Sequence, residues 1–517
     1  MKRNIVRGLG LLSFVWLFGT SLYAQVLSPA GLEMLKQQKF WLHSQNAAGT
    51  VFDDTRNYSN VNIGYGIEEG DFHRPQEGEN IKSLNVGSEG FLSLKDVYVW
   101  GKFSFEQKNV NNAGYNASIT DPFRGMPYYV VDLHKSKWRN QYYDLEFRVG
   151  TPIYWSKIAF GLQGAYTASI ATKQRDPRVD TRFYTLDLIP SITYSIAEKH
   201  KLGLTFEYAS IKEDSRMSNA NNYVDQDYYE LYGLGVAVRG IGSGRTTNYF
   251  GHKLGAGLQY NYITSRVNLL FEGTYTAKVE NVEVSFDDPK KDASVKDQSI
   301  QANVSIYNKG NRYSHYFKTG YYFNHIDGIQ YVSQRDNSES QKGWMDLFKS
   351  IRSTYRLHVV SANYSLYKNM GEEYSWKLDA SMMYKKYQDE YLLPNSTKRA
   401  ENLYFGLCGK KNVALSDLMN NRLLLSISAG YNKSLSGGYY YGGSHADYIT
   451  VTQIEKLDNN YLTSNYYQIG ANITYSQKYR TDKKANIFAK AGYDYVKTND
   501  YNFDHRSHLT FSIGANF

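Results

Sequence analysis

The chain has 517 residues, of which 42% are hydrophobic, and its mean hydropathy is −0.55. It contains 49 Tyr and 42 Gly but only 9 Pro and 1 Cys, a composition that favours strands and tight turns and argues against disorder. After the first thirty residues no stretch of 18 or more continuous apolar residues occurs, which argues against a helical membrane protein. The formal charge of +9 is spread over interleaved acidic and basic residues, so no nucleic-acid surface is expected.

The beginning of the chain has the order of a secretory signal. Three basic residues precede the apolar run Leu9–Phe18, and small residues follow it up to Ala24. An anchoring helix is the alternative, but the run is short and contains Gly and Ser. We therefore expect a signal peptide over residues 1–24, whose removal lowers the formal charge from +9 to +6.

Residues 25–57 come before the first strand pattern and contain the sequence LSPAGLEMLKQQKFWLHSQN, residues 27–46. Ser28 is a candidate helix cap with Pro29 just inside the helix. Apolar residues that include Phe40 and Trp41 form a partial stripe. Two interpretations stay open: a plug seated inside a barrel against its lumen charges, or a short periplasmic helix that leads into the first strand.

From about residue 58 to the end, apolar and polar residues alternate with a period of two in segments of roughly ten residues. Clear examples are residues 97–105, 143–149, 254–262 and 467–475. Because strands of a soluble sandwich also alternate, three further features decide the class. Aromatic residues end the apolar faces, the polar faces are rich in Gly, Ser, Thr, Asn and Gln, and connections tend to alternate short with long. The sequence predicts an all-β fold, a transmembrane antiparallel up-and-down β-barrel with short periplasmic turns and long extracellular loops.

The barrel is expected over residues 58–517. About 18 segments read as strands, but the alternation slips near residues 213–252, where one of them looks false. Because bacterial single-chain barrels close with even strand numbers, we predict about 16 strands, within a range of 14 to 18. Strand side chains alone do not fill a barrel of that size, so it contains either a channel or a plug.

The last strand carries a candidate assembly signal. Apolar residues that include Phe511 and Phe517 alternate with polar ones up to the last residue of the chain. This resembles the terminal strand by which the barrel assembly machinery recognises outer-membrane proteins, although the Gly that commonly precedes the alternating aromatics is absent. The assembly machinery and outer-membrane lipid are therefore expected partners.

Three segments resemble a known family: FWLHSQNAAG at residues 40–49, the alternating residues 61–67, and DPFRGMPYYVVDL at residues 121–133. They are similar to the uncharacterised outer-membrane barrel family of the Bacteroidota called domain of unknown function 6850. The resemblance covers nearly the whole mature chain and implies a bacterial outer-membrane location and a single barrel. It implies no activity, ligand or functional residue.

Charged residues on the polar faces of the strands are candidate lumen residues, because each would be unfavourable in lipid. They are Asp144, Glu146, Arg148, Glu272, Lys278, Lys377, Asp379 and Lys385. Their mixed sign allows two interpretations: a network of ion pairs across the barrel that holds a plug, or a charged constriction that selects solutes.

Candidate binding aromatics lie in the loop GGYYYGGSHADY, where Tyr439, Tyr440 and Tyr441 stand between glycine pairs. They could stack on sugars, peptides or a partner protein, or could pack on neighbouring loops. Elsewhere GIGSGRTT lacks the spacing of a phosphate loop, the scattered His pairs are weak metal candidates, and no Ser has the context of a nucleophile elbow. No catalytic residue, cofactor or metal is therefore predicted.

The leading hypothesis is a non-enzymatic outer-membrane barrel that moves small solutes or serves as the partner subunit of an outer-membrane complex. One alternative is a surface-exposed binding or adhesion protein that the barrel only anchors. A barrel hydrolase is the weaker alternative. Long loops fit the first two hypotheses equally, so the sequence does not separate them.

Overall fold

The computed structural model describes residues 26–53, 56–94, 96–221, 223–242, 244–285, 289–338, 341–416, 421–479 and 485–517. The expected signal peptide lies outside these residues. The helical segments are α2 (Pro29–Gln38), the 3₁₀ turns η1 (Trp41–His43) and η2 (Ala47–Phe52), the π-helical η3 (Thr450–Glu455) and α3 (Lys456–Leu462). Within the described residues, no helix combines the length and apolar character that crossing a membrane requires.

The strands are β1 (Tyr58–Gly70), β2 (Asn80–Leu94), β3 (Val97–Asn116), β4 (Val130–Gly150), β5 (Ile158–Lys173), β6 (Arg178–Ala197), β7 (His200–Ser218), β8 (Gln226–Gly233), β9 (Val236–Gly242), β10 (Gly244–Ile263), β11 (Val267–Ser285), β12 (Lys290–Asn308), β13 (Tyr313–Ser338), β14 (Gln341–Met370), β15 (Glu373–Tyr391), β16 (Ser396–Ser416), β17 (Asn421–Tyr440), β18 (Tyr466–Tyr479), β19 (Ala485–Thr498) and β20 (His505–Asn516).

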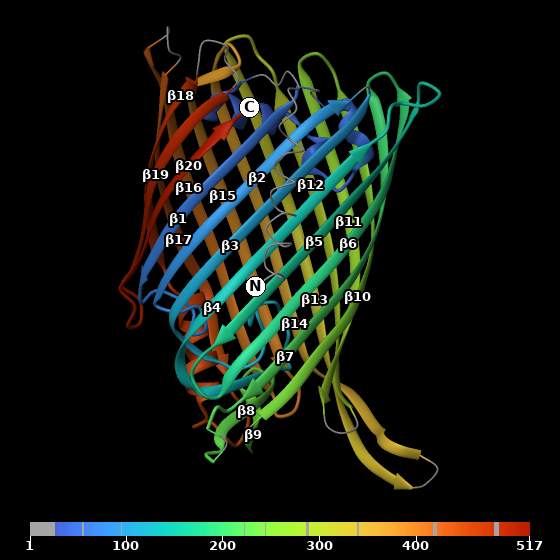
Figure 1. The fold of residues 1–517 in the computed structure, drawn as a ribbon, viewed down its shortest axis with the longest axis vertical. Coiled ribbons are helices and arrows are strands. Elements are labelled where there is room, and N and C mark those ends of the chain that lie inside the picture. The colour runs from blue at the N-terminus through green and yellow to red at the C-terminus, as the bar shows by residue number, and fades with distance from the viewer. Residues whose placement is uncertain are drawn as a thin grey trace, which may run out of the picture.

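Neighbouring strands pair antiparallel, and β1 pairs with β20 to close a barrel (Figure 1). Because β7 pairs directly with β10, the hairpin β8–β9 lies outside the ring, which leaves 18 strands of the 20 in the barrel. The predicted fold class is confirmed, and the strand number is the upper limit of the expected range rather than 16. The region where the alternation slips is this hairpin, which adds onto β4 at residues 130–132.

The period of two sets which side chains face the lumen. On β4, Leu145 and Phe147 point outward and are about 40% exposed, whereas Arg148 reaches carbonyl oxygens inside the barrel. On β1 the outward-facing Val61 and Ile63 are similarly exposed. A contiguous apolar outer surface of this kind on a chain of mixed charge is typical of a face that meets lipid.

Histidine–tyrosine pairs mark both edges of this apolar surface on β7 and β10. The Nδ1 atom of His200 lies 2.7 Å from the hydroxyl of Tyr260 near one edge, and Nδ1 of His252 lies 3.1 Å from that of Tyr208 near the other. Eight residues separate His200 from Tyr208, which is about 20 Å of height for a tilted strand. Amphipathic rings at this spacing resemble the aromatic girdles of a membrane barrel.

The two ends of the barrel differ (Figure 1). The turn end, uppermost in Figure 1, carries short connections such as residues 264–266 and 371–372, together with the C-terminus. The loop end carries longer connections such as residues 117–129 and 441–465. Residues 325–338 and 341–354, whose sequence reads as part of a long connection, instead belong to β13 and β14, and this hairpin extends beyond the barrel, gold at the lower right of Figure 1.

Candidate functional site

The candidate site is the lumen, and the first element in it is the inner segment, residues 27–53. Its helix α2 begins where the sequence predicts: the backbone N–H of Gly31 donates to Oγ of Ser28 at 3.1 Å, and Pro29 occupies the first helical position. The segment lies within the turn end of the barrel, where α2 approaches β15 and η2 contacts β4, β5 and β6. It therefore lies across the lumen.

Glu33 on α2 is the ionic anchor of the inner segment. Its carboxylate accepts from Nζ of Lys377 at 2.9 Å, Nζ of Lys410 at 2.7 Å and the hydroxyl of Tyr374 at 2.7 Å. Burial opposes the ionisation of Glu33, but the two lysines outweigh it and lower the pKa of Glu33 to about 2. Glu33 is therefore a carboxylate at neutral pH and attaches α2 to β15 and β16.

Two further charge contacts fix the opposite side of the inner segment. Lys36 pairs with Glu89 of β2 at 2.6 Å. One guanidinium nitrogen of Arg148 donates to the backbone carbonyls of Leu42 at 2.5 Å and Ser44 at 2.7 Å, while Glu146 pairs with Arg148 at 2.8 Å. Together with Glu33, these contacts attach the segment to β2, β4, β15 and β16.

Glycines in the barrel wall allow the backbone of η2 to approach closely. A Cβ at Gly161 of β5 would lie 2.2 Å from the backbone nitrogen of Ala48, so only glycine fits there. Next to it, the amide of Asn46 donates to Oε1 of Gln259 at 2.9 Å and accepts from Oγ1 of Thr193 at 3.2 Å. The wall and η2 thus form a fitted polar contact.

Apolar contacts complete the seating of the inner segment. Leu32 and Leu35 join a buried cluster with wall residues from β1 to β3. Phe40 meets Tyr316 edge to face at 5.9 Å, and Nε1 of Trp41 donates to Oδ1 of Asn261 at 3.3 Å. Phe40 and Trp41 thus lie against the wall on the β10–β15 side and not against the charges of β4.

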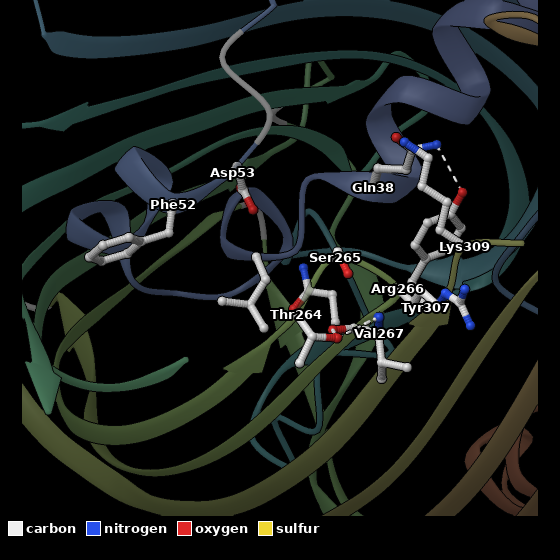
Figure 2. Close-up of a pocket in the computed structure, with 11 residues that line it drawn as sticks. Gln38, Phe52, Asp53, Thr264, Ser265, Arg266, Val267, Tyr307 and Lys309 are labelled. Atoms are coloured by element: carbon white, nitrogen blue, oxygen red, sulfur yellow. Dashed lines mark hydrogen bonds between the residues drawn. The ribbon is translucent and has the colours of Figure 1, made fainter. Parts of the chain in front are cut away.

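Asp53 ends the inner segment and holds its chain reversal. Its carboxylate accepts from the backbone N–H groups of Trp41 at 3.0 Å and Leu42 at 2.8 Å. Burial raises the pKa of Asp53 to about 7, although these N–H groups and Lys39 favour the charged form. Asp53 also lines a pocket of about 140 Å³ at the seam with the turn after β10, where Gln38 donates to the hydroxyl of Tyr307 (Figure 2).

The loop end carries a second closure, here called the lid, which consists of residues 117–129, the β8–β9 hairpin and residues 449–464. Arg124 anchors its first part. The guanidinium donates to both carboxylate oxygens of Glu280 at 2.6 and 2.8 Å, and to Glu213 at 2.9 Å. Both carboxylates are fully buried, so removal of Arg124 would leave Glu213 without an ion pair among the described residues and Glu280 with Lys278 at 3.6 Å.

The other part of the lid, η3–α3, is held by Asp458. This carboxylate pairs with Arg74 of the β1–β2 loop at 2.5 Å and with Lys398 of β16 at 3.0 Å. Burial alone would raise the pKa of Asp458, but Lys398 and Arg74 lower it to about 2. Ile454 packs in one buried cluster with residues of β4 and β8, which joins the parts of the lid.

Solvent-accessible space lies inside the barrel between the two closures. Lys102, Asp144 and Lys490 face inward, yet their side chains are exposed. Asp144 makes only polar contacts there, accepting from Oγ1 of Thr167 at 2.9 Å and Oγ of Ser104 at 3.3 Å. The interior is therefore polar and hydrated.

The predicted charged residues all face the lumen. Arg148, Glu272 and Lys377 contact the inner segment directly, Glu272 by accepting from the backbone N–H of Gln45 at 2.8 Å. Lys278 instead pairs with Asp297 at 3.1 Å. Glu146 forms an ion pair with Arg148, and Asp379 forms one with Lys377. Asp144 and Lys385 contact no residue of the inner segment in the described part of the chain.

The predicted loop aromatics are placed differently from the expectation. Residues 437–440 belong to β17 rather than to a loop. The hydroxyl of Tyr439 donates to the backbone carbonyl of Leu234 at 2.9 Å, so Tyr439 holds the β8–β9 hairpin, whereas Tyr440 is 60% exposed and Tyr441 is half-buried. In β20, Phe511 lies on the outer face. The backbone of Phe517 exchanges two hydrogen bonds with Ser59 at 2.8 and 3.0 Å.

Sequence reasoning missed the lid anchors. Glu280 shares its strand face with the predicted Glu272 and Lys278, so extending the alternation by one step could have found it. Glu213 falls where the alternation slips, and Arg124 lies in a loop with no pattern. Glu33 was visible only as a charge within the candidate helix.

The family model described as a family of unknown function, DUF6850, matches residues 47–517, and the chain therefore belongs to this family. The sequence resemblance is confirmed, whereas the expected bacterial group stays a prediction. A search of curated proteins found no relative.

Solved structures similar to the chain include three bacterial proteins. The ferric preacinetobactin receptor BauA of Acinetobacter baumannii has a TM-score of 0.40 and 8% sequence identity, and the match covers 90% of this chain and 80% of BauA. The iron transporter FrpB of Neisseria meningitidis has a TM-score of 0.39 and 9% identity, with 91% of this chain and 82% of FrpB covered. A FadL homologue of Pseudomonas aeruginosa has a TM-score of 0.32 and 10% identity, with 91% of this chain and 92% of the homologue covered.

Proposed function

We propose that this member of the DUF6850 family is an outer-membrane barrel of a Gram-negative bacterium that is closed at rest and passes small solutes when its two closures move. The observation that carries the proposal is a hydrated polar lumen between two closures that belong to the same chain. The turn end faces the periplasm and the loop end faces the outside. No catalytic step and no cofactor form part of the proposal.

The chemistry of the closures supports movement rather than permanent filling. Glu33, Arg148, Arg124 and Asp458 hold them through ion pairs and charge-assisted hydrogen bonds to the wall. Water can replace such contacts in a hydrated lumen, whereas a large apolar core would have no substitute partner. The apolar clusters of the inner segment are small and lie against tyrosines, which keep a polar atom available.

Conductance in planar lipid bilayers tests the proposal. We expect the intact protein to be silent, and a variant that lacks residues 27–46 and has Arg124→Ala to conduct ions and to let small sugars enter liposomes. Each single variant should conduct less than the double variant, because the closures act in series. A double variant that stays folded, as judged by its heat-modifiable mobility, but neither conducts nor admits sugars would refute solute passage.

The β13–β14 hairpin favours a second candidate function, binding of a partner at the cell surface. Beyond Gln330 and before Ser353 the two strands pair only with each other. Exposed apolar side chains on this arm are Val332, Met345, Leu347, Phe348 and Ile351. Replacing Leu347 and Phe348 by Ser should abolish copurification of a membrane partner and leave conductance unchanged. Equal recovery of that partner with the variant and with the parent protein would contradict this role.

A further inference from the structure

The inference concerns a wall patch inside the barrel, below the end of α3, and it rests on the proposed passage of solutes. The wall patch consists of Lys385 and Tyr387 of β15, Tyr404 of β16 and Tyr466 of β18. The strand register places these four side chains on the inner face of the wall. Tyr404 of β16 pairs with Asn432 of β17, and Asn432 pairs with Tyr466 of β18. On β15, Lys385 lies two residues from the residue that pairs with Tyr404. Tyr387, Tyr404 and Tyr466 thus lie on nearby inward positions of the wall between β15 and β18.

Lys385 has no counter-charge among the described residues. Its cross-strand neighbours are Val359 and Asn402, and no carboxylate lies within ion-pair distance of its Nζ atom. Two other half-buried or buried inward lysines are paired, Lys377 with Glu33 and Lys398 with Asp458, whereas Lys490 is an exposed inward lysine. Because Lys385 is half-buried, its ammonium is an attachment point for an anion.

Tyr404, on the strand next to that of Lys385, offers a flat surface to the lumen. A Cβ at Gly406 would lie 3.1 Å from Cε1 of Tyr404, and a Cβ at Gly430 on the paired strand would lie 3.0 Å from Cε2. The two edges of the ring thus lie over two neighbouring strands, so the ring is parallel to the wall and turns one face to the lumen. The absence of side chains at Gly406 and Gly430 is what permits this orientation.

The lid covers the wall patch. Asn402, opposite Lys385, donates to the backbone carbonyl of Leu462 at 2.9 Å, and Asn432 donates to that of Ser464 at 3.1 Å. Both carbonyls belong to the end of α3 and the residues after it. A solute that enters from the loop end when the lid moves therefore meets this patch as soon as it passes α3.

We propose that the wall patch binds a small solute that carries one carboxylate on a six-membered ring. Lys385 pairs with the carboxylate, the exposed face of Tyr404 stacks on the ring, and the hydroxyls of Tyr387 and Tyr466 bond to its polar edge. Two sources share this chemistry, an acidic sugar and an aromatic acid. A saturated sugar ring offers hydroxyls to all three tyrosines, whereas an aromatic acid uses stacking and the carboxylate alone.

Ligand-observed NMR titration of the intact protein in nanodiscs tests the proposal with glucuronate, benzoate and glucose as probes. We expect saturable binding of at least one of the two acids and binding of glucose that is at least about tenfold weaker, the effect of one charge-assisted contact. Stronger binding of glucuronate than of benzoate identifies the acidic sugar as the source, and the reverse order identifies the aromatic acid. Glucose that binds as tightly as either acid would overturn the role of Lys385.

Matched variants separate this site from general attraction by lumen charge. Lys385→Gln and Tyr404→Leu should each weaken binding of the acids about tenfold, whereas Lys490→Gln, at another exposed inward lysine with Thr474 and Ser512 as its cross-strand neighbours, should leave it within about twofold. Equal weakening by Lys385→Gln and Lys490→Gln would refute a specific site.

The variant Asp458→Asn serves as a control for access of the probe to the wall patch, because it removes a lid anchor and not a residue of the wall patch. No saturable binding in either the intact protein or this variant would overturn the proposal. The experiment measures binding without conduction, so acid binding to a barrel that never conducts would reject the proposed function and keep the site. A conducting barrel that binds no acid would reject the wall patch as a binding site and keep the proposed function.

Discussion

Glu33→Gln gives the most direct test of how the inner segment is held. The carboxylate of Glu33 accepts from Lys377, Lys410 and Tyr374, and these contacts lower its pKa from the ordinary 4.5 to about 2. Lowering the pKa from 4.5 to about 2 corresponds to about 3 kcal/mol in favour of the charged form. Because the side chain is still 27% exposed, we expect Glu33→Gln to weaken the attachment of α2 by about 2 to 3 kcal/mol. This pKa is lowered in the folded state, so its stabilisation is complete above the unfolded value of 4.5 and is lost as the pH falls towards 2.

At pH 7 the variant should therefore release α2 from the wall far more often than the parent protein. Amide hydrogen exchange followed by mass spectrometry measures this opening for the peptide over residues 29–38, and we expect exchange to be about 30 to 150 times faster. The control is Asp297→Asn, which removes a lumen carboxylate that pairs with Lys278 and not with the inner segment. Exchange of the 29–38 peptide that stays within about threefold of the parent in Glu33→Gln, or that rises equally in Asp297→Asn, would refute Glu33 as the anchor.

Three further outcomes are expected. The pKa of Asp53 is raised to about 7 in the folded protein, so the protonated form stabilises the inner segment and this stabilisation is lost as the pH rises from about 4 to about 7. The conductance of a lid variant such as Arg124→Ala should therefore rise between pH 5 and 8. Adding Asp53→Asn to that variant should remove this pH dependence. Phe147→Arg on the outer face should lower barrel stability in denaturant by about 2 to 4 kcal/mol if Phe147 is near the membrane centre, whereas Glu146→Asn should change it much less and loosen Arg148; a larger effect at Glu146 would reverse the assigned faces. Deletion of Phe517 removes two backbone hydrogen bonds to Ser59 at the closing seam and should reduce the heat-modifiable barrel without reducing synthesis; an equal folded yield would contradict a terminal assembly signal.

Alternation predicted the barrel because lipid imposes one apolar face on every membrane-crossing strand. The inward and outward faces of β4 follow from the alternation of Leu145 and Phe147 with Glu146 and Arg148. The same rule fails where a strand leaves the membrane. Residues 331–338 and 341–352 form strands without a lipid-facing side, so their sequence has no single period and reads as a loop. The β8–β9 hairpin also lies outside the ring, and it falls within residues 213–252, where the alternation slips.

The closures were beyond prediction for a different reason. A cap such as Ser28 is a local signal, and the helix that follows it could be expected from the sequence. The partners of Glu33 lie 344 and 377 residues away, and those of Arg124 lie 89 and 156 residues away. Such pairs depend on which strands face each other across the lumen, and no period or motif in one sequence contains that information.

Two closures in series explain how each can be only moderately stable while the barrel stays shut. The contacts of the inner segment described above lie with the wall at the turn end, and those of the lid lie at the loop end, which is consistent with independent movement. If each closure is held by about 3 kcal/mol, the magnitude expected from Glu33, each is open about one hundredth of the time, and both are open together only about one ten-thousandth of the time. A solute that binds below α3 when the lid is open stabilises that state by its binding free energy, so both closures are open together more often. The wall patch at Lys385 is therefore suited to couple recognition of a solute to its passage.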